Sequence, residues 1–196
     1  VKLMTIYITF QNIENGTITY EQEFTSTENA SGMGGSQVFM DPYVNYSVKD
    51  LLRSVIMASA NDASVALAEG ICGSEEQFVE LMNSTAKNLG MNNTLYANAT
   101  GLPAPEQYST ANDCAILLKN LLNYKDYHNF STIWMDSLTH PSGRKTELVN
   151  TNKLIRYYDG CDSGKTGSTS EAGYCLTSSA IRNNMRLISV VIGAKT

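Results

Sequence analysis

Two tripeptides carry three of the four groups that nucleophilic acyl transfer by a serine requires. Ser59-Ala60-Asn61 supplies a hydroxyl and an amide, and Lys165-Thr166-Gly167 supplies an amine and a hydroxyl ahead of a glycine. Such chemistry needs a serine with a lysine base, a second hydroxyl to relay protons, an amide to hold the substrate and a cation for its carboxylate. Backbone N–H groups must also face the developing oxyanion. Each tripeptide occurs once, and 165 − 59 = 106 residues separate them.

A phosphate-binding loop is the other chemistry that a lysine between glycines can serve. That loop needs four residues between its first glycine and the Gly-Lys-Ser/Thr, and a helix after it. Here only three residues separate Gly160 from Gly164, and a strand-like run follows Thr166. The carboxylate of Asp162 would also face the phosphates. The sequence therefore favours acyl transfer over phosphate binding.

Each tripeptide also has a purely structural interpretation. The Ser59 to Asn61 segment can close one helix and cap the next, and Lys165 can be a solvated strand lysine. The chain has two histidines, His128 and His140, and four cysteines without metal-ligand spacing. We therefore expect no metal or cofactor, structural histidines, and cysteines that are buried free thiols. The net charge of -5, without clustered basic residues, argues against nucleic acid as a partner.

The elements that must position these side chains follow from hydrophobic spacing and capping signals. The pattern predicts one α+β catalytic domain over 1–196, with a mostly helical block over about 47–140 and antiparallel strands over about 145–196. A glycine-rich surface loop over 31–36 is expected beside a site. The predicted helices cover 1–10, 47–58, 63–71, 75–89 and 110–123, with a weaker amphipathic segment at 124–138. The predicted strands cover 17–24, 147–155, 164–168, 173–181 and 185–193.

The order of several short motifs is more specific than any one of them. With these motifs the chain resembles the low-molecular-mass penicillin-binding proteins, the serine-type D-alanyl-D-alanine carboxypeptidases, and looks closest to their sporulation-type branch. The resemblance implies the β-lactamase/penicillin-binding fold, an antiparallel sheet flanked by helices with a helical subdomain. The motifs are Lys2-Leu-Met-Thr5, Ser31-Gly-Met-Gly-Gly-Ser36, Ala58-Ser-Ala-Asn-Asp-Ala63, Asn98-Ala-Thr-Gly-Leu-Pro103, Asn150-Thr-Asn-Lys-Leu154 and Asp159-Gly-Cys-Asp-Ser-Gly-Lys-Thr-Gly167.

The resemblance implies a catalytic role for three residues of the chain. Lys2 matches the lysine of the family's Ser-x-x-Lys motif and would be the general base, if burial or a cationic neighbour lowers its pKa. Ser59 would relay a proton to the leaving D-alanine, and Asn61 would hold the substrate's amide. The nucleophilic serine would stand three residues before Lys2, so we expect a fragment truncated at both ends that is itself inactive. Two internal Ser-x-x-Lys matches, at Ser84 and Ser142, stand in the wrong order to replace it.

The last motif would form the opposite wall of the cleft. Lys165 and Thr166 would bind the terminal carboxylate, and Gly167 would let the strand approach the substrate. The backbone N–H of Ser168 would be one oxyanion donor. The family often has a large aliphatic residue at the position of Gly164, so we expect a looser entry to the strand.

The implied partners are a peptidoglycan stem peptide ending in D-Ala-D-Ala and, as inhibitors of the intact enzyme, β-lactam antibiotics. The expected location is extracytoplasmic, with membrane contact only through segments outside this sequence. Two alternatives share the fold. A class A β-lactamase would need a Glu with Asn four residues later between the second and third motifs, and none occurs. A non-catalytic protein that binds peptidoglycan is the other alternative.

Overall fold

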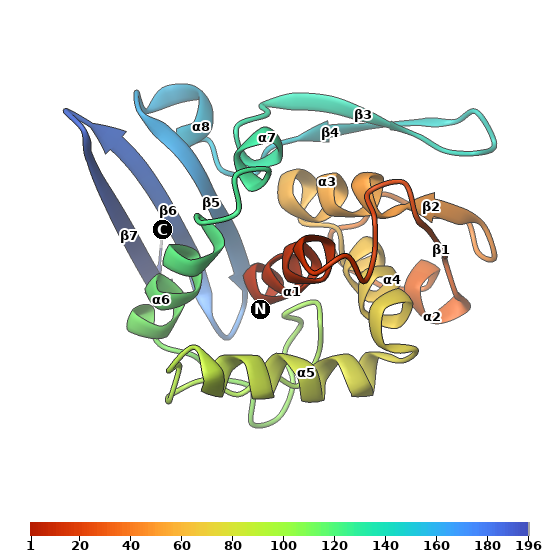
Figure 1. Cartoon of the computed structure of the whole chain (residues 1–196), viewed down its shortest axis with the longest axis horizontal. Coiled ribbons are helices and arrows are strands. Elements are labelled where there is room, and N and C mark those ends of the chain that lie inside the picture. The colour runs from red at the N-terminus through yellow and green to blue at the C-terminus, as the bar shows by residue number, and fades with distance from the viewer. Residues whose placement is uncertain (196) are drawn as a thin grey trace.

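In the computed structural model, which describes residues 1–195, a block of helices lies beside a three-stranded antiparallel sheet, and α1 (Lys2–Glu14) runs between them (Figure 1). α1 is buried without interruption from Leu3 to Phe10, as expected of a helix that is packed on all sides. The remaining helices are α2 (Glu28–Ser31), α3 (Val48–Ala58), α4 (Asn61–Cys72), α5 (Glu75–Asn88), α6 (Ala111–Leu121), α7 (Tyr127–Ser131) and α8 (Leu154–Tyr157).

Three of the predicted helices begin at a hydroxyl side chain that caps them. The hydroxyls of Ser47, Ser74 and Thr110 accept the backbone N–H three residues later, at the starts of α3, α5 and α6. These bonds satisfy N–H groups that have no partner within the helix. The predicted helices of this region are therefore confirmed, except that α4 already begins at Asn61.

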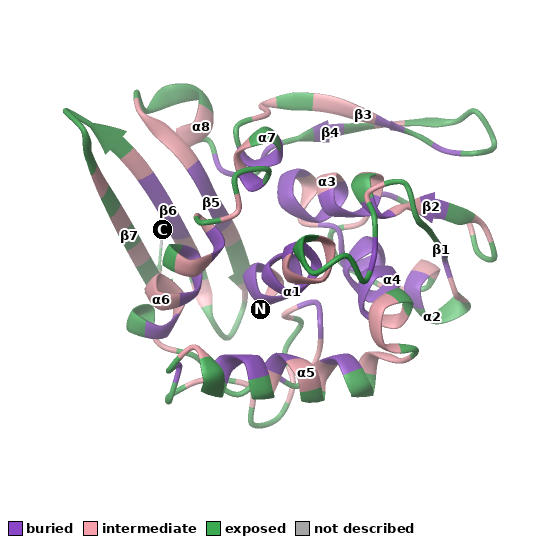
Figure 2. Ribbon diagram, viewed as in Figure 1, coloured by how far each residue is buried: buried purple, intermediate pink, exposed green. Residues whose placement is uncertain are grey.

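The main sheet has the order β5-β6-β7, with β5 (Cys161–Thr169), β6 (Gly173–Arg182) and β7 (Met185–Ala194) joined by tight turns. α6, α7 and α8 contact this sheet. Its centre is buried, whereas β7 is exposed along most of its length (Figure 2). Two small antiparallel pairs, β1 (Glu23–Thr25) with β2 (Asn45–Ser47) and β3 (Met135–Thr139) with β4 (Lys145–Val149), lie beside the helical block.

Three predicted elements were wrong in type or length. The segment 124–138 is not one helix, because it contains the short α7 and then β3. The strand expected over 147–155 ends at Val149, and α8 follows. The strand expected over 17–24 is reduced to β1. β3 and β4 each bury one large apolar residue, Leu138 and Leu148, so the alternation that reveals a strand is too weak to read.

The predicted α+β class is confirmed, and the division of the chain into domains stays a prediction. None of the helices in residues 1–195 is both long and apolar enough to cross a membrane.

Candidate active site

Lys2, at the first position of α1, points its amine at the loop that joins α5 to α6. Its Nζ donates a hydrogen bond to the carbonyl oxygen of Thr100 at 2.6 Å. Burial lowers the pKa of Lys2 to about 8, while the carboxylate of Asp62 acts in the opposite direction. A buried amine titrating this close to neutrality can take up a proton at physiological pH, as a general base must.

Ser59 and Asn61 stand at the junction of α3 and α4. Ser59 ends α3 in the left-handed conformation, with φ of 60°, which costs a residue other than glycine about 1–2 kcal/mol. The capping interpretation of this segment is only half met, because Ala60 is the N-cap residue of α4 and has no side chain that could cap it.

Asn61 is 3% exposed and lies under the glycine-rich loop. Its Nδ2 donates to the carbonyl of Gly34 at 2.7 Å, and its backbone N–H donates to the carbonyl of Ser36 at 2.7 Å. The Oδ1 atom is buried and has no hydrogen-bond partner among the described residues. A buried amide oxygen without a partner is unusual and is free to accept a hydrogen bond from a bound molecule.

Asp62 holds the segment that follows the glycine-rich loop. Its two oxygens accept backbone N–H groups from Val38, Met40 and Ala63 at 2.9 to 3.2 Å. The side chain is completely buried. One carboxylate thus ties the first turn of α4 to the segment that follows the glycine-rich loop.

Lys165 lies in the middle of β5 and is 6% exposed. Burial, and to a smaller extent the neighbouring amine of Lys2, lowers its pKa to about 7. The Nζ atom donates to the carbonyl of Thr166 at 3.1 Å. The structural interpretation of Lys165 as a solvated strand lysine is therefore wrong. The buried Lys165 and the half-buried Lys2 form a pair of amines that repel each other when both are charged.

Hydrogen bonds through one intermediate residue, Thr151, connect Thr166 of β5 to the end of α3. The Thr166 hydroxyl donates to the Thr151 hydroxyl at 2.7 Å, and the Thr151 backbone N–H donates to the carbonyl of Met57 at 3.0 Å. Met57 is two residues before Ser59. Two hydrogen bonds therefore connect the Lys165-Thr166-Gly167 tripeptide to the last turn of α3, two residues before Ser59.

The two glycines around Lys165 differ in what surrounds them. Gly164 has φ of +147°, and a Cβ there would lie 2.5 Å from the carbonyl oxygen of Thr177. The expectation of a loose strand entry is therefore wrong, because close packing leaves no room for a side chain. At Gly167 a Cβ would meet only the Cβ of Cys175, at 3.9 Å, so the protein's own packing does not require that glycine.

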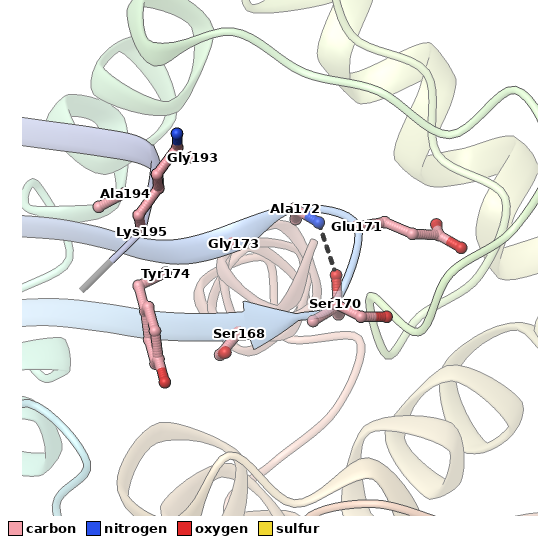
Figure 3. A pocket seen from close by; sticks show the side chains of 10 residues that line it. Ser168, Ser170, Glu171, Ala172, Gly173, Tyr174, Gly193, Ala194 and Lys195 are labelled. Carbon is pink, nitrogen blue, oxygen red and sulfur yellow. Dashed lines mark hydrogen bonds between the residues drawn. The ribbon is translucent and has the colours of Figure 1, made fainter.

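Ser168 lies at the exposed end of β5, opposite Tyr174 of β6. Figure 3 shows both residues beside an open hollow of about 670 Å³ between the β5–β6 turn and the end of β7. Lys2, Ser59, Asn61 and Lys165 do not line this hollow. We place the candidate site at the lysine pair rather than in the hollow. β5 has a strand partner on one edge only within residues 1–195, so its other edge can accept an extended peptide.

The remaining chemically active side chains lie elsewhere. Ser84 is in α5 and donates to the carbonyl of Leu81, and Ser142 is exposed in the β3–β4 turn. His140 is buried and forms hydrogen bonds with Tyr46 and Thr146, as expected of a structural histidine. The described residues contain no group of His, Cys, Asp or Glu that could hold a metal ion. The cysteines are free, but they are half-buried rather than buried: Cys72, Cys114, Cys161 and Cys175.

Sequence reasoning did not identify Asp62 or Thr151 as parts of this site. Asp62 follows Asn61 directly, and an acidic residue in the first turn of a helix is common enough to be read as a helix-dipole effect. Thr151 stands in a loop, where nothing local shows that it bridges two distant elements.

Solved structures of penicillin-binding proteins share this fold. The structure of the D-alanyl-D-alanine carboxypeptidase DacD from Francisella tularensis superposes with a TM-score of 0.94 at 32% identity, covering 100% of this chain and 59% of that one. Penicillin-binding protein D2 from Listeria monocytogenes, in its ampicillin-bound form, superposes with a TM-score of 0.85 at 29% identity, covering 100% of this chain and 78% of that one.

The sequence comparisons define the family. A family model described as D-alanyl-D-alanine carboxypeptidase matches residues 1–196, and the chain belongs to that family. The D-alanyl-D-alanine carboxypeptidase DacF of Bacillus subtilis (strain 168) is 47% identical over 195 residues, which cover 100% of this chain and 50% of the relative. The chain spans about half the length of the curated relatives it matches.

Proposed function

We propose that the polypeptide to which this chain belongs is a serine-type D-Ala-D-Ala carboxypeptidase, which removes the terminal D-alanine from peptidoglycan stem pentapeptides through an acyl-enzyme. The observation that carries the proposal is the pair of neighbouring amines, the half-buried Lys2 and the buried Lys165, whose pKa values are lowered to about 8 and about 7. A lysine needs such a lowered pKa to act as a base, and an ordinary surface lysine does not have one.

Substrate binding would set the protonation states of the two amines. Lys165 and Thr166 receive the terminal carboxylate, and that negative charge raises the pKa of Lys165 and keeps it protonated. The resulting cation disfavours a second proton on Lys2. Lys2 is then neutral and ready to accept a proton from a serine three residues earlier, one helical turn away.

The reaction would then proceed by two acyl transfers. The serine oxygen bonds to the D-Ala-D-Ala carbonyl carbon while its proton passes to Lys2. Ser59 relays a proton to the amine of the leaving D-alanine as the C–N bond breaks, and Asn61 holds the substrate's amide. The N–H groups of Ser168 and of the serine stabilise the oxyanion. Water then cleaves the ester and regenerates the serine.

The relatives support the substrate class. Those compared above include proteins named D-alanyl-D-alanine carboxypeptidases and a penicillin-binding protein in an ampicillin-bound form. We therefore propose β-lactams as inhibitors. Because peptidoglycan is assembled outside the cytoplasmic membrane, we also propose an extracytoplasmic location.

The test uses the polypeptide that carries a serine three residues before Lys2. It should release D-alanine from a stem pentapeptide and be labelled by a fluorescent penicillin, and Lys165→Ala should lower D-alanine release at least tenfold. Residues 1–196 alone should not be labelled, because neither Ser84 nor Ser142 lies at the lysine pair. Labelling of that shorter chain would contradict the assignment. Penicillin hydrolysis without D-alanine release would indicate a β-lactamase, and binding without either reaction would indicate a non-catalytic protein.

A further inference from the structure

The Thr100 carbonyl that accepts the hydrogen bond from Lys2 belongs to a turn built around one side chain, Asn98. The Oδ1 atom of Asn98 accepts the backbone N–H of Gly101 at 2.7 Å and that of Thr100 at 3.2 Å. Its Nδ2 atom donates to the carbonyl of Leu102 at 2.9 Å. An asparagine that bonds the backbone two and three residues later holds a turn closed.

The bond to Gly101 has a directional consequence. The carbonyl of Thr100 and the N–H of Gly101 belong to the same planar trans peptide unit, so they point in opposite directions. When Asn98 holds the N–H on one side, the carbonyl must point to the other, where the Nζ of Lys2 lies 2.6 Å away. The orientation of the partner of Lys2 is therefore set by a residue that does not touch Lys2.

In this loop, the Thr100–Gly101 peptide is the unit whose orientation depends on Asn98. The preceding residue is already fixed, since the Ala99 carbonyl accepts from Thr5 at 2.9 Å and the Ala99 N–H donates to Glu75 at 2.9 Å. Gly101 has φ of +82° and no Cβ to restrict its backbone, so a hydrogen bond is needed to keep this peptide in one orientation.

We propose that Asn98 is a positioning residue for the reaction described above, and that it acts by locking the Thr100–Gly101 peptide so that its carbonyl holds the Lys2 amine in one orientation. A neutral amine has two N–H groups and one lone pair. With one N–H directed at Thr100, the lone pair is directed away from that carbonyl. The inference rests on the proposed function for its meaning, but its geometric part can be tested without catalysis.

The first measurement is the titration of the Lys2 side chain by NMR, in the chain itself. The carbonyl favours the charged amine, because an ammonium group donates a stronger hydrogen bond than a neutral amine. Asn98→Ala should therefore move the titration midpoint of Lys2 downward by roughly one pH unit. Asn98→Ser, which keeps an accepting oxygen for the turn, should restore part of the shift.

Asn83 of α5, which also holds this loop, offers a matched control. Asn83 makes two hydrogen bonds to the backbone of Tyr96, at 2.8 Å each, but none to the Thr100–Gly101 peptide. Asn83→Ala should destabilise the loop and leave the midpoint of Lys2 unchanged. The proposal would be overturned if the titration midpoint of Lys2 is unchanged in Asn98→Ala, or if it rises because water enters.

The second measurement is acylation by a fluorescent penicillin in the polypeptide that carries the serine. Asn98→Ala should slow the acylation step about tenfold with little change in the affinity of the initial complex, and Asn83→Ala should not. Equal slowing by both variants would reduce Asn98 to a structural role. If the Lys2 midpoint shifts as expected but the unsubstituted polypeptide is never acylated, the positioning stands and the proposed function fails.

Discussion

Replacing the buried carboxylate of Asp62 by an amide should weaken the fold and alter Lys2 at the same time. Both oxygens of Asp62 accept backbone N–H groups: Oδ1 from Ala63 at 2.9 Å, Oδ2 from Met40 at 3.2 Å, and the two together from Val38. In Asp62→Asn, one oxygen becomes an NH₂ group that faces either Ala63 or Met40. One hydrogen bond to a charged acceptor is then lost, and a buried N–H group has no partner.

The cost follows from these two losses. A hydrogen bond to a charged group contributes about 1.5–3 kcal/mol, and a buried unpaired donor costs about 1–3 kcal/mol. Allowing for relaxation, Asp62→Asn should lower the free energy of unfolding by about 3 kcal/mol. With a urea m-value of about 2 kcal/mol/M, the unfolding midpoint falls by about 1.5 M.

Asp113→Asn is the matched control, because Asp113 is also a buried carboxylate. Both of its hydrogen bonds, from the Asn93 N–H and the Thr94 hydroxyl, fall on one oxygen, which an asparagine can retain. We expect a smaller midpoint change in urea unfolding for the control. Asp62→Asn should also lower the pKa of Lys2, since the Asp62 carboxylate raises it, and Asp113→Asn should not. Equal urea unfolding midpoints for the two variants, or an unchanged pKa of Lys2 in Asp62→Asn, would refute this reasoning.

Substitutions at four further positions test the cleft walls. Burial lowers the pKa of Lys165 from 10.5 to about 7, so the unfolded chain binds more protons between these values and stability should rise with pH across that window. Lys165→Met should flatten this rise and stabilise the protein most below pH 7, which urea titrations at several pH values would show. Ser59→Gly should relieve left-handed strain and stabilise the protein by about 1 kcal/mol in thermal unfolding, whereas Ser59→Ala should not; both should lower D-alanine release. Gly164→Ala should destabilise the fold by at least about 2 kcal/mol, because it introduces both a clash and an unfavourable φ. Gly167→Ala should leave the melting temperature within a few degrees and weaken substrate binding, and an equal loss of stability in both glycine variants would contradict this.

The helices and the β6–β7 hairpin were predictable because each has strong local signals. Ser47, Ser74 and Thr110 cap their helices through side chains that are visible in the sequence, and Asn183-Asn184 adopt the positive φ values of a tight turn. Of the β3–β4 hairpin only the end of β4 was predicted, because its strands are stabilised by contacts with distant segments. Arg53, for example, binds Asp136 across 83 residues at 2.7 Å. No local pattern encodes such a partner.

The candidate site, like the fold, has features that the sequence predicts and features that it does not. Ser59, Asn61 and Lys165 were identified by residue type, spacing and order, and Lys2 through the family resemblance; the assignment of their catalytic roles stays a prediction. What the sequence does not show is how their environment alters them. The burial that lowers the pKa of Lys165 and the orientation of the Thr100 carbonyl both arise from residues that are distant in the chain.

The link from Thr166 through Thr151 to Met57 has a consequence for how substrate preference can change. The side chain and the backbone N–H of Thr151 hold the end of α3 against β5. We call these two elements, joined in this way, the frame of the site. The rims above this frame are loops: the glycine-rich segment over Asn61, and Leu102, whose side chain would lie 3.8 Å from a Cβ at Gly35. Substitutions in these rims could accommodate stem peptides of different shape while the distances between the reacting groups stay constant. Evolution of a new stem-peptide preference is therefore expected to vary the rims and to preserve the frame.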